Sequence, residues 1–238
     1  MKVQRYRRPL GTLRYCLLTI LAALLFLPLF GPCRVSVAEK EEGTVEPITT
    51  LVEYGQVVFG SIGAPGGTQD FTFQAETGDI ILIRVSRVSG DLWPRIQMSD
   101  PDDELLRDEH SPVHVEFSEK ARHGGTYGIE VSDGFDGTGV GTYRLYLQRL
   151  NGAAASTPLS FGQTEAGSIT QEAEMDAFTF TAEQGDVILT RVSSDSGDLW
   201  PEVRLYDPAG RLLNSSYDPS YAEFTMVLPT TYLVFLPM

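Results

Sequence analysis

The sequence predicts an all-β protein: two tandem antiparallel β-sandwich domains of jelly-roll type, behind an N-terminal signal peptide helix. Shifted by 107 residues, the chain matches itself. Residues 55–106 align with residues 162–213 without a gap, and 27 of these 52 positions are identical. Within each copy, β-branched and aromatic residues alternate with polar ones between Gly, Pro and Asp, which is typical of strands. No stretch after the N-terminal segment has helical periodicity. A repeat of this length is a whole domain rather than a solenoid unit.

Residues 1–38 have the pattern of a secretory signal peptide. Basic residues occupy the start, a mostly apolar run covers Cys16–Phe30, and small residues follow at Ser36 and Ala38. The apolar run is shorter than the roughly 20 residues that a membrane-spanning helix needs. We therefore expect an exported protein cleaved after Ala38, with an uncleaved N-terminal anchor as the alternative.

The charge of the remaining chain limits its partners. Six of the 18 basic residues and none of the 32 acidic ones lie in residues 1–38, so the rest carries a net charge of −20. Such a surface repels nucleic acids and anionic lipids. We expect no nucleic-acid partner, and membrane contact only through the signal peptide or an uncleaved anchor. Both cysteines also lie in residues 1–38, so the rest has no thiol chemistry.

Composition divides the chain into segments. Residues 39–47 are predicted to be an acidic flexible tail, 48–150 the first sandwich repeat, 151–158 a linker of small and turn-forming residues, and 159–238 the second repeat. In the first repeat, period-two patterns predict strands near residues 56–62, 70–75, 79–87, 95–99, 113–118, 126–131 and 142–148.

The second repeat is predicted to lack its last strand. Thr231-Tyr232 matches Thr126-Tyr127, but nothing after it matches the 133–141 loop or the 143–148 strand. Such a sandwich would leave an unpaired edge, which favours association. We therefore expect the chain to be a fragment of a longer gene product.

The sequence motifs resemble a known family. The order "GQVVFGSI", "DFTFQAETGDIILIRVS", "RIQMSDPDDELL" and "GGTYGIEVSDGFDGTGVGTYRLYLQRL" resembles the bacterial pre-peptidase C-terminal domain. The second copy matches through "GQTEAGSI", "AFTFTAEQGDVILTRVS" and "EVRLYDPAGRLL". The resemblance implies an extracellular, non-catalytic β-sandwich module that in some relatives binds calcium or a polymeric substrate.

The hexapeptide SGDLWP occurs in both repeats, at residues 89–94 and 196–201. Duplication accounts for its recurrence, and we expect Leu92 and Leu199 to enter the two cores. Trp93 and Trp200 have two interpretations. Each ring packs at the end of its sandwich, or each stands exposed as a stacking surface for a sugar or peptide ligand.

Two acidic loops are candidate calcium sites. Asp133 and Asp136 lie among glycines in the 133–139 loop and are the candidate calcium ligands, with a purely structural loop as the alternative. The acidic stretch at 99–104 aligns with Asp207-Pro208, which favours a turn that begins at Asp-Pro. We expect no other cofactor.

The sequence points to binding rather than catalysis. Residues 39–238 contain no Cys nucleophile and no GxSxG motif, and we predict that the protein is not an enzyme and has no catalytic residues. The expected function is binding or adhesion outside the cell, to a polysaccharide, a peptide polymer or an envelope protein. The alternatives are a structural spacer and an accessory domain of a larger secreted hydrolase.

Overall fold

The computed structural model describes residues 49–229 and 232–237, and these residues form strands, turns and loops. Within this part of the chain no helix is long and apolar enough to cross a membrane. The predicted all-β class is confirmed. The predicted signal peptide, residues 1–38, and the acidic tail, residues 39–47, lie outside the described residues.

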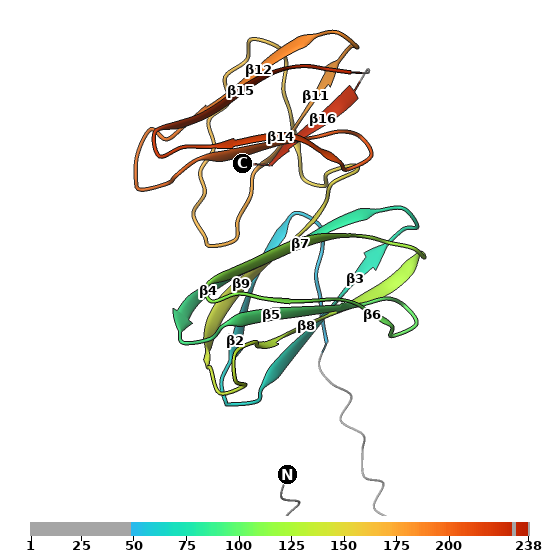
Figure 1. Ribbon diagram of the computed structural model, residues 1–238, viewed down its shortest axis with the longest axis vertical. Helices are drawn as coiled ribbons and strands as arrows, with labels where there is room; N and C mark the ends of the chain where they lie inside the picture. Colours follow the sequence, from blue (N-terminus) through green and yellow to red (C-terminus); the bar gives the residue numbers. More distant parts are fainter. Residues whose placement is uncertain (1–48, 230–231, 238) are drawn as a thin grey trace, which may run out of the picture. The chain divides into compact units, whose positions relative to one another are not determined.

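The first repeat is a sandwich of two sheets (Figure 1). All neighbouring strands are antiparallel except β1 and β3, which are parallel. The five-stranded sheet has the order β1 (Thr50–Leu51), β3 (Thr68–Ala75), β8 (Gly125–Asp133), β5 (Pro94–Ser99) and β6 (Leu105–His110). The four-stranded sheet has the order β2 (Gln56–Ile62), β9 (Gly141–Arg149), β4 (Ile80–Gly90) and β7 (His114–Lys120).

Period-two alternation places the core of the first repeat between its sheets, as predicted. On β9 the inward side chains of Tyr143, Leu145 and Leu147 are fully buried. The Tyr143 ring packs edge-on against Phe71, with centroids 6.5 Å apart. Its hydroxyl donates a hydrogen bond of 2.7 Å to Oε1 of Gln69. β9 is therefore a central strand whose side chains fill the core.

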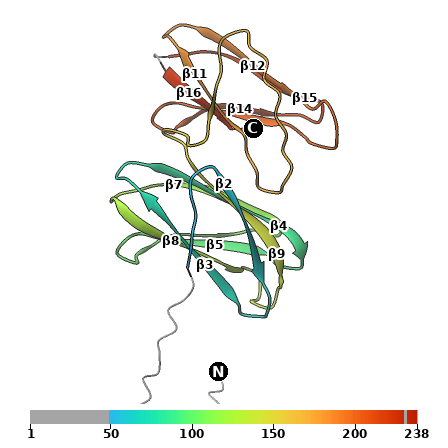
Figure 2. The same cartoon turned by 180° about the vertical axis from the view of Figure 1, so that it is seen from behind.

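The second repeat has the same architecture without the central strand (Figure 2). Its larger sheet has the order β10 (Thr157–Pro158), β11 (Ala177–Ala182), β16 (Tyr232–Pro237), β13 (Glu202–Tyr206) and β14 (Leu212–Tyr217). Its other sheet contains only β12 (Val187–Ser193) and β15 (Tyr221–Val227). Among the described residues no strand corresponds to β9, which agrees with the predicted missing strand. Residues 163–170, which match β2 and the residue after it, form no strand.

The segment 151–158 is held by hydrogen bonds. The Asn151 side chain accepts the Ile80 N–H at 2.8 Å and donates to the Gly78 carbonyl at 3.0 Å. Buried Gln148 accepts the Ala154 N–H at 3.1 Å. At the end of the segment, Thr157 and Pro158 form β10, which pairs in parallel with β11. These contacts fix the path by which the chain leaves the first sandwich.

A small apolar cluster joins residues of the two repeats. The first repeat contributes Leu82, Tyr146 and Leu150, and the second contributes Ala173, Met175, Ala177 and Tyr206. The Tyr146 hydroxyl also donates to the Met175 carbonyl at 3.2 Å. Tyr146 and Leu82 lie on the outer side of their sheet, so this cluster covers side chains that the core of the first repeat does not.

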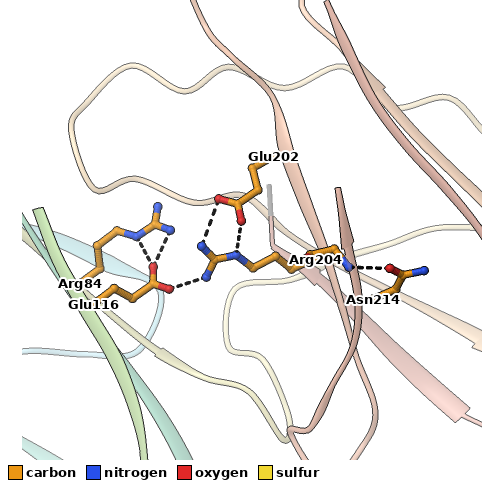
Figure 3. A network of polar contacts seen from close by, with 6 residues as sticks. Arg84, Glu116, Glu202, Arg204 and Asn214 are labelled. Atoms are coloured by element: carbon orange, nitrogen blue, oxygen red, sulfur yellow. Dashed lines mark hydrogen bonds and ion pairs between the residues drawn. The ribbon is translucent and has the colours of Figure 1, made fainter. Parts of the chain in front are cut away.

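An ion network lies beside this cluster (Figure 3). Glu116 accepts a hydrogen bond of 2.6 Å from Nε of Arg84 and also pairs with Arg204 of the second repeat. Nε of Arg204 donates to Glu202 at 2.7 Å. Burial raises the pKa of Glu116, but Arg84 and Arg204 outweigh it and hold that pKa below its usual value.

Candidate functional site

The candidate site is the outer face of the five-stranded sheet in the first repeat. On β5 the even-numbered residues face the core, and the odd-numbered ones form a row on the other side. That row, extended by the residue before the strand, consists of Trp93, Arg95, Gln97 and Ser99. We call this surface, together with the outward residues of β3 and β8, the outer face.

A hollow of about 430 Å³ lies on the outer face. Gly128 on β8 helps to form it, because a Cβ at this position would lie only 2.5 Å from Oγ of Ser99. The lining combines apolar surface, to which Leu105 contributes, with polar residues: Thr49, Asp70, Thr72, Gln97, Ser99, Asp103 and Glu130. The hollow thus offers carboxylate, amide and hydroxyl groups along one surface.

A fixed ion pair lies next to this hollow. Nε of Arg95 donates to Oδ1 of Asp108 on the neighbouring strand β6, at 2.7 Å. The same carboxylate accepts a hydrogen bond of 3.3 Å from Nε2 of Gln97. The hydrogen bond from Arg95 lowers the pKa of Asp108. Asp108 therefore orients both the guanidinium and the amide of the β5 row.

An aromatic pair lies at the end of the row. The rings of Trp93 and Phe135 have centroids 4.6 Å apart and are tilted by 31°. Trp93 is half-buried, whereas 67% of Phe135 is exposed. The Trp93 N–H donates to Oδ1 of Asp133 at 2.9 Å, which ties the row to the 133–139 loop. The Trp93 ring thus packs against Phe135 while part of it stays exposed, and a role in ligand binding stays a prediction.

Trp200 has a different environment from Trp93. It is 64% exposed, and the preceding Leu199 is 42% exposed. The expectation that Leu199 enters a core is wrong, whereas its counterpart Leu92 is fully buried as predicted. Leu92 lies next to Gly141 and its N–H donates to the Val140 carbonyl at 3.2 Å. The matching loop is absent from the described part of the second repeat, so nothing there covers Leu199.

Asp133 and Asp136 shape the loop that carries Phe135. Oδ2 of Asp133 accepts the Gly137 N–H at 2.9 Å, and Oδ1 of Asp136 accepts both donors of Thr138. Burial raises the pKa of Asp133, but backbone N–H groups beginning with that of Trp93 lower it further than burial raises it. Among the described residues no group of three or more His, Cys, Asp or Glu is arranged to hold a metal ion. Calcium binding by Asp133 and Asp136 stays a prediction.

Sequence reasoning missed most of this site. Asp70, Gln97, Glu130 and Phe135 were not singled out. Two signals in the sequence could have indicated these residues. The alternation along β5 places Gln97 on the same side as Trp93, and Phe135 is a large aromatic residue among the glycines of 133–137. The neighbouring strands that complete the hollow come from distant parts of the chain.

Comparisons with known proteins find similarity among solved structures. No family model matches the chain, and no curated protein matches it. One similar structure is the pre-peptidase C-terminal domain of a collagenase from Bacillus anthracis, with 19% identity and a TM-score of 0.34 over 42% of this chain and 94% of that one. Another is CorA, a surface-associated copper-binding protein of Methylomicrobium album BG8, with 8% identity and a TM-score of 0.32 over 42% of this chain and 96% of that one.

Proposed function

We propose that this chain is a non-catalytic exported module that binds an extracellular polysaccharide through the outer face of its first repeat. The observation that supports this is that one row of β5 carries both the Trp93–Phe135 pair at its start and, further along, Gln97 and Ser99, which line the hollow. Sugars combine apolar ring faces with hydroxyl groups. Aromatic rings stack on the former, and carboxylates and amides hydrogen-bond the latter.

The proposal includes the domain type and the location. We propose that both repeats are of the pre-peptidase C-terminal type, on the strength of the sequence motifs, and that residues 1–38 direct export. The net charge of −20 after residue 38 favours an uncharged or cationic polymer over an anionic one.

The test is co-sedimentation of the protein with insoluble cellulose, chitin and a fibrillar peptide polymer. For Phe135→Ala we expect about a fivefold loss of affinity for the glycan that is bound, since one aromatic contact contributes on the order of 1 kcal/mol. Gln97→Ala is also expected to weaken binding, because it removes an amide that lines the hollow further along the row. Trp200→Ala is the matched control, because it removes an exposed Trp from the second repeat.

Three results would contradict the proposal. Retention on none of the polymers favours a structural spacer. Retention on the peptide polymer alone favours a protein ligand. An equal loss of affinity in Trp200→Ala and Phe135→Ala would mean that the outer face is not the binding site. Thermal melting of each variant separates lost binding from lost folding.

A further inference from the structure

Three carboxylates line the hollow on the outer face, those of Asp70, Asp103 and Glu130, and the lining includes no Lys, Arg or His. Within residues 49–229 and 232–237, no hydrogen bond or ion pair holds these three carboxylates. The buried carboxylate of Asp100, by contrast, accepts two backbone N–H groups of its turn. The hollow therefore carries negative charge that the described part of the chain does not neutralise.

Two of these carboxylates face each other across neighbouring strands. Asp70 on β3 is the register partner of Glu130 on β8, and both side chains lie on the outer side of the sheet. Like charges directly opposite each other in an antiparallel pair lower stability. The guanidinium of Arg95 on the same face is already held by Asp108. A cationic ligand would relieve the repulsion between the two carboxylates.

A buried hydroxyl on the same face also lacks a partner. Ser132 follows Glu130 on the outward row of β8 and is only 8% exposed. Its Oγ has no hydrogen-bond partner among the described residues, although most buried polar groups have one. A polar ligand on the outer face would supply this partner, directly or through a bound water.

The second repeat shows that the sandwich does not require all of these carboxylates. With the shift of 107 residues, Ala177 and Gly210 occupy the positions of Asp70 and Asp103. The aspartate that forms the Asp-Pro turn, by contrast, is present and has the same contacts in both copies. The carboxylates of Asp70 and Asp103 thus have no structural role that is common to the two repeats.

We propose that the polymer bound by the outer face is an amino-sugar polymer with free amino groups, whose ammonium groups lie in the hollow. This inference rests on the proposed function, because it names the chemistry of the polysaccharide. The exposed ring of Phe135 stacks on one sugar ring. The carboxylates of Asp70 and Glu130 accept charge-assisted hydrogen bonds from an ammonium group. N-acetylation of the sugar removes the positive charge and with it this contact.

The length of the β5 row determines which ligands reach both parts of the site. Trp93 and Gln97 are four positions apart in the chain, which corresponds to roughly 13 Å along a strand. A monosaccharide therefore reaches either the aromatic pair or the hollow, whereas an oligomer reaches both. We expect the affinity for glucosamine oligomers to rise with their length until they span this distance.

The test is isothermal titration calorimetry of the full chain with a glucosamine hexamer and an N-acetylglucosamine hexamer, at a pH at which free amines are protonated. The two probes have the same length and backbone. We expect the glucosamine hexamer to bind about tenfold more tightly, because one exposed ion pair contributes up to about fivefold and more than one forms. Added salt is expected to reduce this preference, since it screens exposed charges.

Variants of the hollow identify the carboxylates. The double variant Asp70→Asn, Glu130→Gln keeps the shape of both side chains and is expected to bind the two hexamers equally. It should melt no lower than the unaltered protein, because it removes a pair of opposed like charges. Glu76→Gln is the matched control, since it removes an exposed carboxylate of the same repeat that does not line the hollow. It is expected to keep the preference.

Three results would overturn this inference. The first is equal affinity of the unaltered protein for the two hexamers, with Phe135→Ala weakening both. The second is an unchanged preference in the double variant. Either result leaves the proposed function intact. The third is binding of a lysine hexamer as tightly as the glucosamine hexamer, which would assign the hollow to a basic peptide. Binding of neither sugar hexamer contradicts the proposed function itself.

Discussion

At the scale of single residues, several acidic side chains organise turns. Asp100 is buried, and its Oδ1 accepts the N–H groups of Asp102 and Glu104, each at 2.9 Å. Asp207 in the second repeat does the same for Ala209 and Arg211. The repeated geometry shows that the Asp-Pro pair builds one turn twice, as the alignment of the two copies predicted.

Replacement of Asp100 tests this role. Asp100→Ala leaves two backbone N–H groups without their acceptor, and we expect a loss of about 1–3 kcal/mol in the free energy of unfolding. Asp102→Ala removes an exposed carboxylate from the same turn and is expected to change stability by less than about 0.5 kcal/mol. Urea unfolding of both variants measures the difference. Similar values for the two variants would contradict a capping role for Asp100.

Calcium binding is tested at the same scale. If Asp133 and Asp136 hold a structural ion, millimolar calcium raises the melting temperature, since ligand that binds only the folded state stabilises it. Asp136→Asn is expected to remove that rise. An unchanged melting temperature for the unaltered protein at millimolar calcium leaves the loop with a structural role only.

At the scale of elements, strand formation depends on the partner strand. The Gly-Ser-Ile sequence is part of β2 in the first repeat and lies outside any strand in the second. The two segments differ at three positions before this sequence, where Val-Val-Phe at 57–59 stands against Thr-Glu-Ala at 164–166, so local strand preference and pairing with β9 both favour the strand in the first repeat. Sequence reasoning also missed β6, where half of the residues, Arg107, Asp108 and Glu109, are charged. Such a composition suits an edge strand, which charges protect from association, but it hides the strand from a search for apolar alternation.

Gly60 tests the fit of β9 against β2. Gly60→Ala would place a Cβ 2.2 Å from the Tyr143 ring, so the strand or the ring must shift. We expect a loss of about 1–3 kcal/mol in stability, as for other overpacked cores. Gly63→Ala is the matched control, because nothing lies within 4 Å of a Cβ at that position. Equal melting temperatures for these two variants would mean that the sheet absorbs the methyl group.

At the scale of the whole molecule, side chains of both repeats share an apolar cluster and an ion network. The Arg84–Glu116 pair has a direct counterpart in Arg191–Glu223. Of these two glutamates, Glu116 alone also pairs with an arginine of the other repeat within the part of the chain that the structure describes. Duplication therefore accounts for the Arg–Glu pair in both repeats. In the first repeat, the contact with the second repeat adds Arg204 as a further partner of Glu116.

The pH dependence of stability tests the junction. The pKa of Glu116 is lowered from its usual 4.5, so its stabilising effect is present above about pH 4.5 and is lost as the pH falls through the folded-state value. At pH 7, Glu116→Gln is expected to cost on the order of 2 kcal/mol. The difference in stability between this variant and the unaltered protein is expected to disappear as the pH falls. Melting curves from pH 7 to pH 3 measure it.

Glu223→Gln is the control for this experiment. Its pair with Arg191 is more exposed and is expected to contribute less than about 1 kcal/mol. His114 also titrates near Glu116, and burial and Arg84 lower its pKa. Because His114 is present in both proteins, the difference between them reports chiefly on Glu116. A gap that does not change with pH would contradict the role of the glutamate charge.

By itself, the sequence determined the duplication, the all-β class, the alternation that fills each core and the Asp-Pro turns. These features depend on local pattern or on comparison of the two copies. The tertiary structure decided which strands pair, that residues 163–170 form no strand, that Leu199 is exposed, and that Trp93 packs against Phe135. Each of these features depends on contacts between segments that are distant in the chain, and a single sequence does not show which distant segments lie close together.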